Sequence, residues 1–194
     1  MEDMNLTEML DGVEINEPGS GPMPQGDYLV KIMGVEVKTS KTGGRYVKVE
    51  YAVASGEFEG RKLYANYNLK CNVNSDKVIS LMADGLSKEE AEAKATESAE
   101  AGTRIGRIEI KKLTTAAGFI DPKDAEKDPS LAKLVNDGLA VSWPADFSLD
   151  MIEGKTVMCR TKAETRGDKT YQTPKSVWFA DPAKIGDTGE SAPF

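Results

Sequence analysis

The sequence of 194 residues contains no histidine. Histidine is the usual general base for serine and cysteine nucleophiles and the most common zinc ligand. Its absence excludes the ordinary catalytic triads and the typical zinc sites. Cysteine is scarce as well: Cys71 and Cys159 stand far apart and form no CxxC motif. We therefore expect two reduced thiols in or near the core rather than a disulfide or a metal site.

Long apolar runs are also missing. No stretch approaches the ~18 apolar residues that a membrane helix requires. The first ten residues, MEDMNLTEML, lack the basic and apolar regions of a secretory signal. We therefore expect a soluble, cytoplasmic protein.

A phosphate-binding loop is absent from the sequence too. Residues 41–44, KTGG, lack the GxxxxGK[ST] spacing and lie between two runs that resemble strands. The carboxylates are concentrated in stretches that we expect to be solvent-exposed. We therefore expect no enzyme activity, no cofactor and no metal.

The clearest pattern that is present lies in residues 28–69, where three runs rich in Val, Ile and Tyr are separated by glycine-containing breaks. Such a pattern predicts a three-stranded antiparallel meander. The apolar residues change parity at Met33-Gly34, which predicts a β-bulge in the first strand. Strand parity points one set of side chains inward (Val47, Val49, Tyr51, Val53, Leu63, Ala65, Tyr67, Leu69) and another outward (Tyr46, Lys48, Glu50, Lys62, Tyr64, Asn66). Tyr28 and Phe179 are also assigned to the core, and Trp178 is assigned to neither set.

Helices are expected after the meander. Ser87 and Glu90 have the spacing of a capping box that opens an Ala/Glu-rich helix to about residue 101. A separate helix is expected over residues 103–117 with Gly118 as its stop, and Asp128-Pro129 suits the start of a short helix. Two strands, residues 156–164 and 170–179, close the pattern, and Pro174 places the last one at an edge or a bulge.

This order of elements predicts a mainly β protein with helical insertions, folded as a five-stranded OB barrel with a helix between strands 3 and 4. Residues 1–22 are expected to be a flexible acidic leader. The barrel domain spans residues 23–180, with insertions at residues 71–102 and 121–146. Residues 181–194 are expected to be a disordered acidic tail.

The net charge of −7 is unevenly distributed. Three blocks, residues 27–70, 103–119 and 155–179, carry +3, +3 and +4 respectively. These blocks coincide with the expected strands and one helix. The pattern therefore indicates a polyanionic partner despite the acidic total.

The segments GDYLVKI, VEVKTSKTGGRYVKVEY, SGEFEGRKLY, RIGRIEIKKLTTAAG and MIEGKTVMCRTK also carry a resemblance. Together they resemble a family of small phage proteins that was long catalogued as a domain of unknown function. The resemblance covers about residues 24–70, 103–120 and 147–180. It implies single-stranded DNA binding in replication or recombination, inside a bacterial host cell.

The end of the sequence is similar to the tip of bacterial single-stranded DNA-binding proteins, where a terminal Phe enters a pocket on partner enzymes. Here the tip is Pro193-Phe194, and Asp187 and Glu190 supply the nearby acids. The tip differs from that family in having Ser191-Ala192 before it. The resemblance implies that these four residues bind a replication or recombination protein.

The leading hypothesis is a non-enzymatic, sequence-independent single-stranded DNA-binding protein that protects the strand and recruits partners through its tail. Cations would follow the phosphates and rings would stack on bases. The expected DNA-binding residues are Lys41, Arg45, Tyr46, Lys48, Lys62, Tyr64, Arg104, Arg107, Lys111, Arg166 and Lys169.

The alternative hypothesis is a protein-binding adaptor or inhibitor that engages a basic host protein through the acidic helical insertions. The pattern leaves the choice between a monomer and a homodimer open. It leaves the preference for DNA over RNA open as well.

Overall fold

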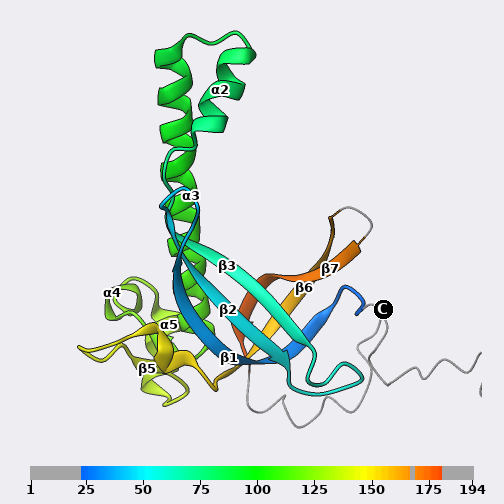
Figure 1. Ribbon diagram of the computed structural model, residues 1–194. Coiled ribbons are helices and arrows are strands. Elements are labelled where there is room, and N and C mark those ends of the chain that lie inside the picture. Colours follow the sequence, from blue (N-terminus) through cyan, green and yellow to red (C-terminus); the bar gives the residue numbers. More distant parts are fainter. Residues whose placement is uncertain (1–22, 167–168, 181–194) are drawn as a thin grey trace, which may run out of the picture.

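The computed structural model describes residues 23–166 and 169–180, without the side chains of residues 166, 169 and 170. Five long strands form one antiparallel sheet in the order β3-β2-β1-β6-β7 (Figure 1). Their bounds are β1 (Asp27–Thr39), β2 (Arg45–Val53), β3 (Lys62–Lys70), β6 (Thr156–Arg166) and β7 (Lys169–Phe179). The meander and the two closing strands are therefore confirmed.

The expected OB barrel is wrong. The edge strands β3 and β7 do not pair, so the sheet stays open. The long helix α3 (Lys88–Ala116) contacts both edges instead. Arg107 Nε donates to the Leu69 carbonyl oxygen at 3.2 Å, so the helix satisfies an edge group that a closing ladder would have used. Helices and strands hold similar numbers of residues, so the fold is mixed α and β rather than mainly β.

Strand parity sets the core. Val47, Val49 and Tyr51 are fully buried on the inner face of the sheet. The Tyr51 hydroxyl meets that of Tyr67 at 2.9 Å, and burial raises the pKa of Tyr67 to about 12. The predicted bulge is confirmed, because Ile32 pairs with Tyr51 while Gly34 pairs with Glu50. Tyr28 is half-buried and packs against the core.

The helical segment differs from the expectation in one respect. The two helices expected over residues 87–101 and 103–117 are a single helix, α3, of 29 residues. Its capping box at Ser87 and Glu90 is confirmed, and Gly118 follows it with φ +85°. The preceding helix α2 (Ser75–Ala83) packs beside its first half, and the pair projects from the sheet as an arm (Figure 1).

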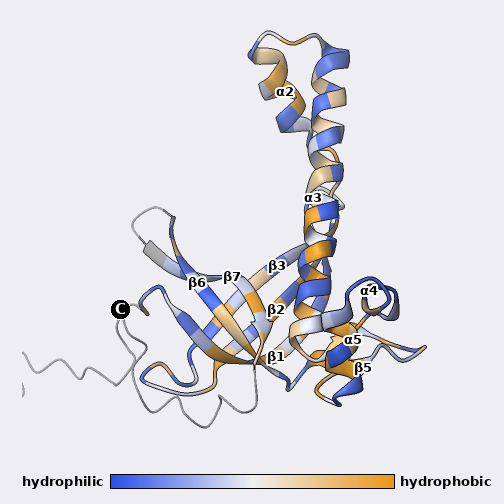
Figure 2. Ribbon diagram, turned by 180° about the vertical axis from the view of Figure 1, so that it is seen from behind, coloured by the Kyte–Doolittle hydropathy of each residue, from blue (hydrophilic) through white to orange (hydrophobic). Residues whose placement is uncertain are grey.

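Gly106 explains how α3 lies so close to the sheet. A Cβ atom at this position would stand 2.1 Å from the Asn68 carbonyl oxygen and 2.6 Å from the Asn68 nitrogen. Only glycine permits this approach of two backbones. Beyond it, Ile110 and Leu113 enter the core. Figure 2 shows apolar residues in this half of α3, whereas its outer half is largely hydrophilic.

The segment between α3 and β6 contains a second, smaller sheet that the sequence pattern did not predict. Strands β4 (Phe119–Ile120) and β5 (Val141–Ser142) pair in parallel. Around them lie α4 (Pro122–Ala125), α5 (Pro129–Asn136) and the 3₁₀ helix η1 (Leu149–Ile152). Asp128 caps α5 as expected, with its carboxylate accepting from the Ser130 nitrogen.

The last strand and the two cysteines are further features that the sequence pattern addressed. Pro174 lies in the edge strand β7 next to a register shift, so both expectations for it are confirmed. Both cysteines are free, Cys159 buried and Cys71 half-buried. Within the described ranges, no helix is both long and apolar enough to cross a membrane.

Candidate nucleic-acid interface

The β1–β2 hairpin is fixed against the base of the arm. Asn72 Nδ2 donates to the Thr42 carbonyl oxygen at 2.9 Å. The Cys71 nitrogen donates to Thr103 Oγ1 of α3, also at 2.9 Å. A Cβ atom at Gly44 would lie 2.8 Å from the Lys70 carbonyl oxygen, so the hairpin closes directly onto the end of β3. Hairpin, strand end and helix therefore meet at one place.

Five cations lie on the three elements that meet there, and we call this set of residues the basic junction. Arg45 is the ladder partner of Lys70, and Arg107 is tied to β3 by its bond to Leu69. The members are Lys41, Arg45, Lys70, Arg104 and Arg107, all of them exposed. Four were predicted to bind DNA. Lys70 was not, although it ends the same positive block of sequence.

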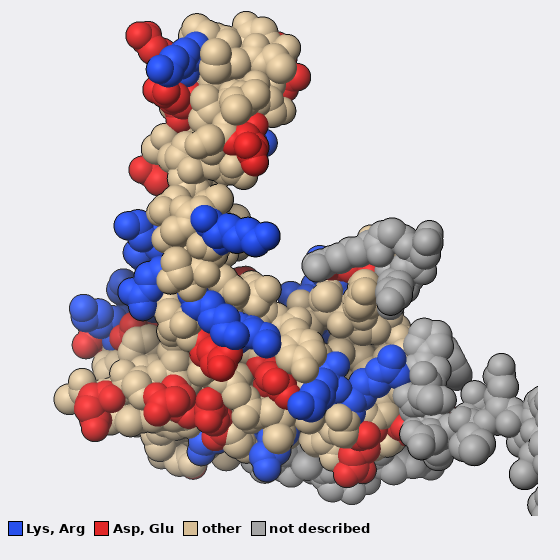
Figure 3. Space-filling model, viewed as in Figure 1, with Lys and Arg blue, Asp and Glu red and all other residues tan. Residues whose placement is uncertain are grey.

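The charge of the basic junction is not compensated. In the described part of the chain, none of its five side chains forms an ion pair. Figure 3 shows Lys and Arg gathered on the middle of the α3 column, below the acidic side chains near its top. A cluster of like charges without counter-charges attracts a polyanion.

The outer face of β2 and β3 extends from the junction. Lys48 Nζ stands 4.9 Å from the centroid of the Tyr64 ring, and 45% of Tyr64 is exposed. Tyr46 lies on the same face but is half-buried. Lys62 is paired with Glu50 at 2.7 Å, and this pairing raises the pKa of Lys62. The face therefore offers a ring beside Lys48, and its charge is more mixed than that of the junction, because Glu36, Glu50 and Glu153 line the same hollow as Lys48.

Lys111 is compensated, unlike the two arginines expected to share its stripe. Its Nζ lies 2.9 Å from carboxylate oxygens of both Asp121 and Asp124. Hydrogen bonding to these carboxylates raises the pKa of Lys111, and the Lys111 ammonium lowers the pKa of Asp121. This lysine ties α4 to α3, so its ion pairs distinguish it from Arg104 and Arg107.

A second cation and ring pair lies on β6 and β7. Arg160 makes two hydrogen bonds to the Asp27 carboxylate, at 2.6 and 2.7 Å, which lower the pKa of Asp27. The guanidinium carbon lies 5.7 Å from the centroid of the Trp178 ring, which is 37% exposed. Because Asp27 neutralises Arg160, this pair is a weaker candidate than Lys48 and Tyr64.

Several expected site residues cannot be placed. The side chains of Arg166 and Lys169, at the β6–β7 turn, lie outside the described part of the structure. The same holds for the leader, residues 1–22, and for the tail, residues 181–194, with the four tip residues named above.

Comparison with known proteins gives one match. Residues 11–84 match the model of a family described as "Protein of unknown function (DUF669)". In the structure this segment contains β1, β2, β3 and α2, and it stops before α3. A search of curated proteins found no match.

Proposed function

We propose that this protein binds single-stranded DNA without sequence preference and without enzymatic activity, in phage-type replication or recombination. The observation that carries the proposal is the uncompensated basic junction. It adjoins a sheet face on which Lys48 and the exposed ring of Tyr64 stand together. Cations that follow a backbone, next to rings on which bases stack, are the usual means of binding single strands.

The basic junction and the sheet face would bind different groups of the strand. Phosphates would lie on Lys41, Arg45, Lys70 and the two arginines of α3, because these cations lack a carboxylate partner among the described residues. Bases would stack on Tyr64, and on the exposed edge of Tyr46. Such contacts discriminate little between bases, since every base has a stacking face.

Titration with fluorescent dT oligomers at several salt concentrations tests the charge contacts. Arg45→Gln and Lys41→Gln should each flatten the plot of log affinity against log salt by roughly 0.7. Lys94→Gln is the matched control, since it removes one positive charge from the arm away from the junction. Equal slopes for all three variants and the wild type would remove the basic junction from the interface.

A pair of tyrosine variants tests stacking. Tyr64→Ala should weaken dT binding by roughly 1–3 kcal/mol and leave the fold intact. Tyr171→Ala is the control, because its ring is 47% exposed, close to the 45% of Tyr64, but lies on β7 at the opposite edge of the sheet. Equal losses in the two variants would mean that bases do not stack specifically on β3.

The proposal includes the bacterial cytoplasm as the site of action and recruitment of a replication or recombination enzyme by the tip. The support is the sequence resemblance alone. Removing Phe194 should spare dT binding and abolish binding of that enzyme. Equal binding of the enzyme by both forms would show that the ending is a coincidence.

An adaptor function is the second candidate, and one observation favours it. Helix α2 buries none of its residues and exposes Ile79 and Met82 on the arm. Exposed apolar side chains that adjoin acids suit a basic, amphipathic protein partner. An adaptor would lose its partner in an Ile79→Ser, Met82→Ser double variant and would be insensitive to Arg45→Gln. The DNA-binding proposal expects the reverse sensitivity in dT titrations.

A further inference from the structure

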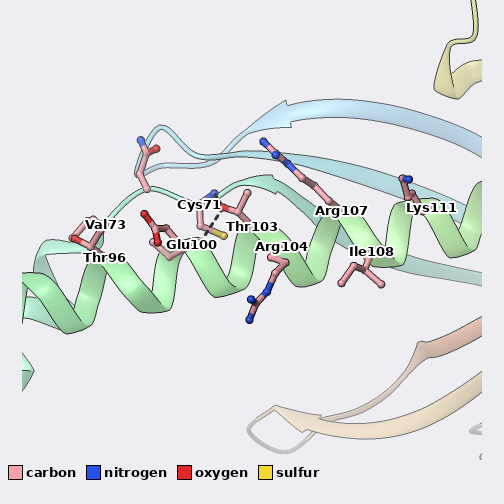
Figure 4. A pocket seen from close by; sticks show the side chains of 11 residues that line it. Cys71, Val73, Thr96, Glu100, Thr103, Arg104, Arg107, Ile108 and Lys111 are labelled. Atoms are coloured by element: carbon pink, nitrogen blue, oxygen red, sulfur yellow. Dashed lines mark hydrogen bonds between the residues drawn. The ribbon is translucent and has the colours of Figure 1, made fainter. Parts of the chain in front are cut away.

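A groove of about 700 Å³ runs along α3 beside the basic junction (Figure 4). Its walls come from α3 and from the segment that leaves β3. Proteins hold small-molecule ligands in pockets of roughly 300–1,000 Å³. The groove is therefore large enough for part of a nucleic-acid strand.

The floor of the groove is largely apolar. It includes the Cys71 thiol, Val73 and Ile108, and the small Ala99 keeps it open. Val73 and Ile108 are 42% and 47% exposed, so the fold leaves this apolar surface uncovered. The flat faces of unpaired bases gain from covering such a surface.

The rim of the groove is cationic. Figure 4 shows Arg104 and Arg107 pointing to opposite sides of α3. The bond from Arg107 to Leu69 uses Nε only, so its two terminal amino groups remain as donors. Lys111 also lines the groove but is compensated by Asp121 and Asp124. Among the described residues, Glu100 is the only acid that lines it, and it lies toward the α2 end.

We infer that this groove takes unstacked nucleotides of the bound strand, with bases on the floor and phosphates on Arg104 and Arg107. The inference rests on the proposed function and extends the path of the strand from the sheet onto the arm. Continuity favours this occupant, because Asn72 both lines the groove and holds the hairpin of the basic junction. The charge of the rim favours it too, and Glu100 would end the path before α2.

Filling the groove without changing its charge is the first test. Ala99→Leu should lower the affinity for a dT oligomer roughly five- to hundredfold, the factor expected for the loss of one stacked base, because leucine fills the groove and offers no ring on which a base could stack. Ala93→Leu is the matched control, since Ala93 is exposed on the same helix and lies outside the groove. Neither residue is buried, so both variants should fold.

Alkylation of Cys71 in the wild-type protein is the second test. Cys159 is fully buried and burial raises its pKa to about 12, so Cys71 is the reactive thiol. A saturating dT oligomer should slow iodoacetamide labelling of Cys71 roughly tenfold or more, as close contact requires. A poly-glutamate peptide of equal charge is the control ligand and should slow it less.

The results of these two tests distinguish a failure of the proposed function from a failure of the inference about the groove. If the wild type does not bind dT, the proposed function fails and the inference fails with it. If the wild type binds dT but Ala99→Leu binds equally well and Cys71 stays reactive, only the inference fails. Stronger protection of Cys71 by poly-glutamate than by dT would make the occupant an acidic polypeptide, which also overturns the inference.

Discussion

The two halves of α3 belong to one unbroken helix but are stabilised in different ways. The half next to the sheet buries Ile110 and Leu113 in the core and reaches β3 through Gly106. The half next to α2 buries only Ala91 and Ala95. One half is therefore held by tertiary packing, and the other by its cap and by contact with a short helix.

This difference assigns separate tasks to the two halves. An isolated helix of fewer than about 12–15 residues is marginal in water, so the outer half depends on continuity with the anchored half. Regions with few buried apolar contacts open locally at low cost. The proposed groove lies where the two halves meet, between a rigid base and a softer arm.

The largest expected effect comes from breaking the anchored half. Gly106→Ala places a Cβ atom 2.1 Å from the backbone of Asn68, and neither backbone can move without separating helix from sheet. We expect a loss of roughly 3 kcal/mol or more in the free energy of unfolding. Urea unfolding followed by circular dichroism measures it.

Gly102→Ala is the matched control on the same helix. Its Cβ atom would meet only the Cys71 thiol, at 3.1 Å. Alanine gains up to about 1 kcal/mol over glycine in a helix, so this variant should stay within about 1 kcal/mol of the wild type. Equal stability of the two variants would mean that α3 does not contact β3 at Gly106.

A smaller effect is expected at the start of the outer half. Ser87→Ala removes the hydroxyl that accepts from the Glu90 nitrogen and donates to its carboxylate. Loss of an N-cap costs about 1 kcal/mol of helix stability. Because this half is weakly coupled to the core, hydrogen exchange should accelerate over residues 88–95 while the main unfolding transition moves little.

Thr96→Ala is the control for the cap, since Thr96 only donates to the carbonyl oxygen of Glu92 within the helix. It should leave exchange over residues 88–95 unchanged. A drop in the main transition for Ser87→Ala would indicate that the arm and the sheet unfold as one unit.

Local patterns in the sequence predicted local features well. Parity placed Val47, Val49 and Tyr51 inward because side chains alternate along a strand. The capping box at Ser87 follows equally local rules, as does the bulge at Met33. Each of these features depends on residues within a few positions of one another.

Features that depend on distant contacts were mispredicted or missed. Whether β3 pairs with β7 is decided by α3, which covers the edges where a barrel would close. The break expected before Thr103 does not occur, and this position is held by a distant contact, since the Cys71 nitrogen donates to Thr103 Oγ1. The candidate site also contains features that depend on contacts between residues far apart in the sequence. Arg107 is bonded to β3 while Arg104 points to the other side of α3, and the partners of Lys111 come from a segment that a helix-face argument does not include.

The smallest expected effect concerns Lys111, which ties α4 to the anchored half. The pKa of Asp121 is lowered from 3.8 and that of Lys111 is raised from 10.5. Between pH 3.8 and pH 10.5 both groups are therefore charged and the ion pair contributes fully to stability. It is lost as pH falls below 3.8 through the lowered pKa of Asp121, and as pH rises above 10.5 through that of Lys111.

Because 45% of the Lys111 side chain is exposed, solvent screening limits its contribution to less than about 1 kcal/mol. Lys111→Met should therefore lower stability slightly at pH 7, and its difference from the wild type should shrink as the pH falls below 3.8, in thermal unfolding measured across pH. Lys112→Met, which removes only the exposed pair with Glu109, should change neither value. An equal loss in both variants at pH 7 would show that α4 is not held by this lysine.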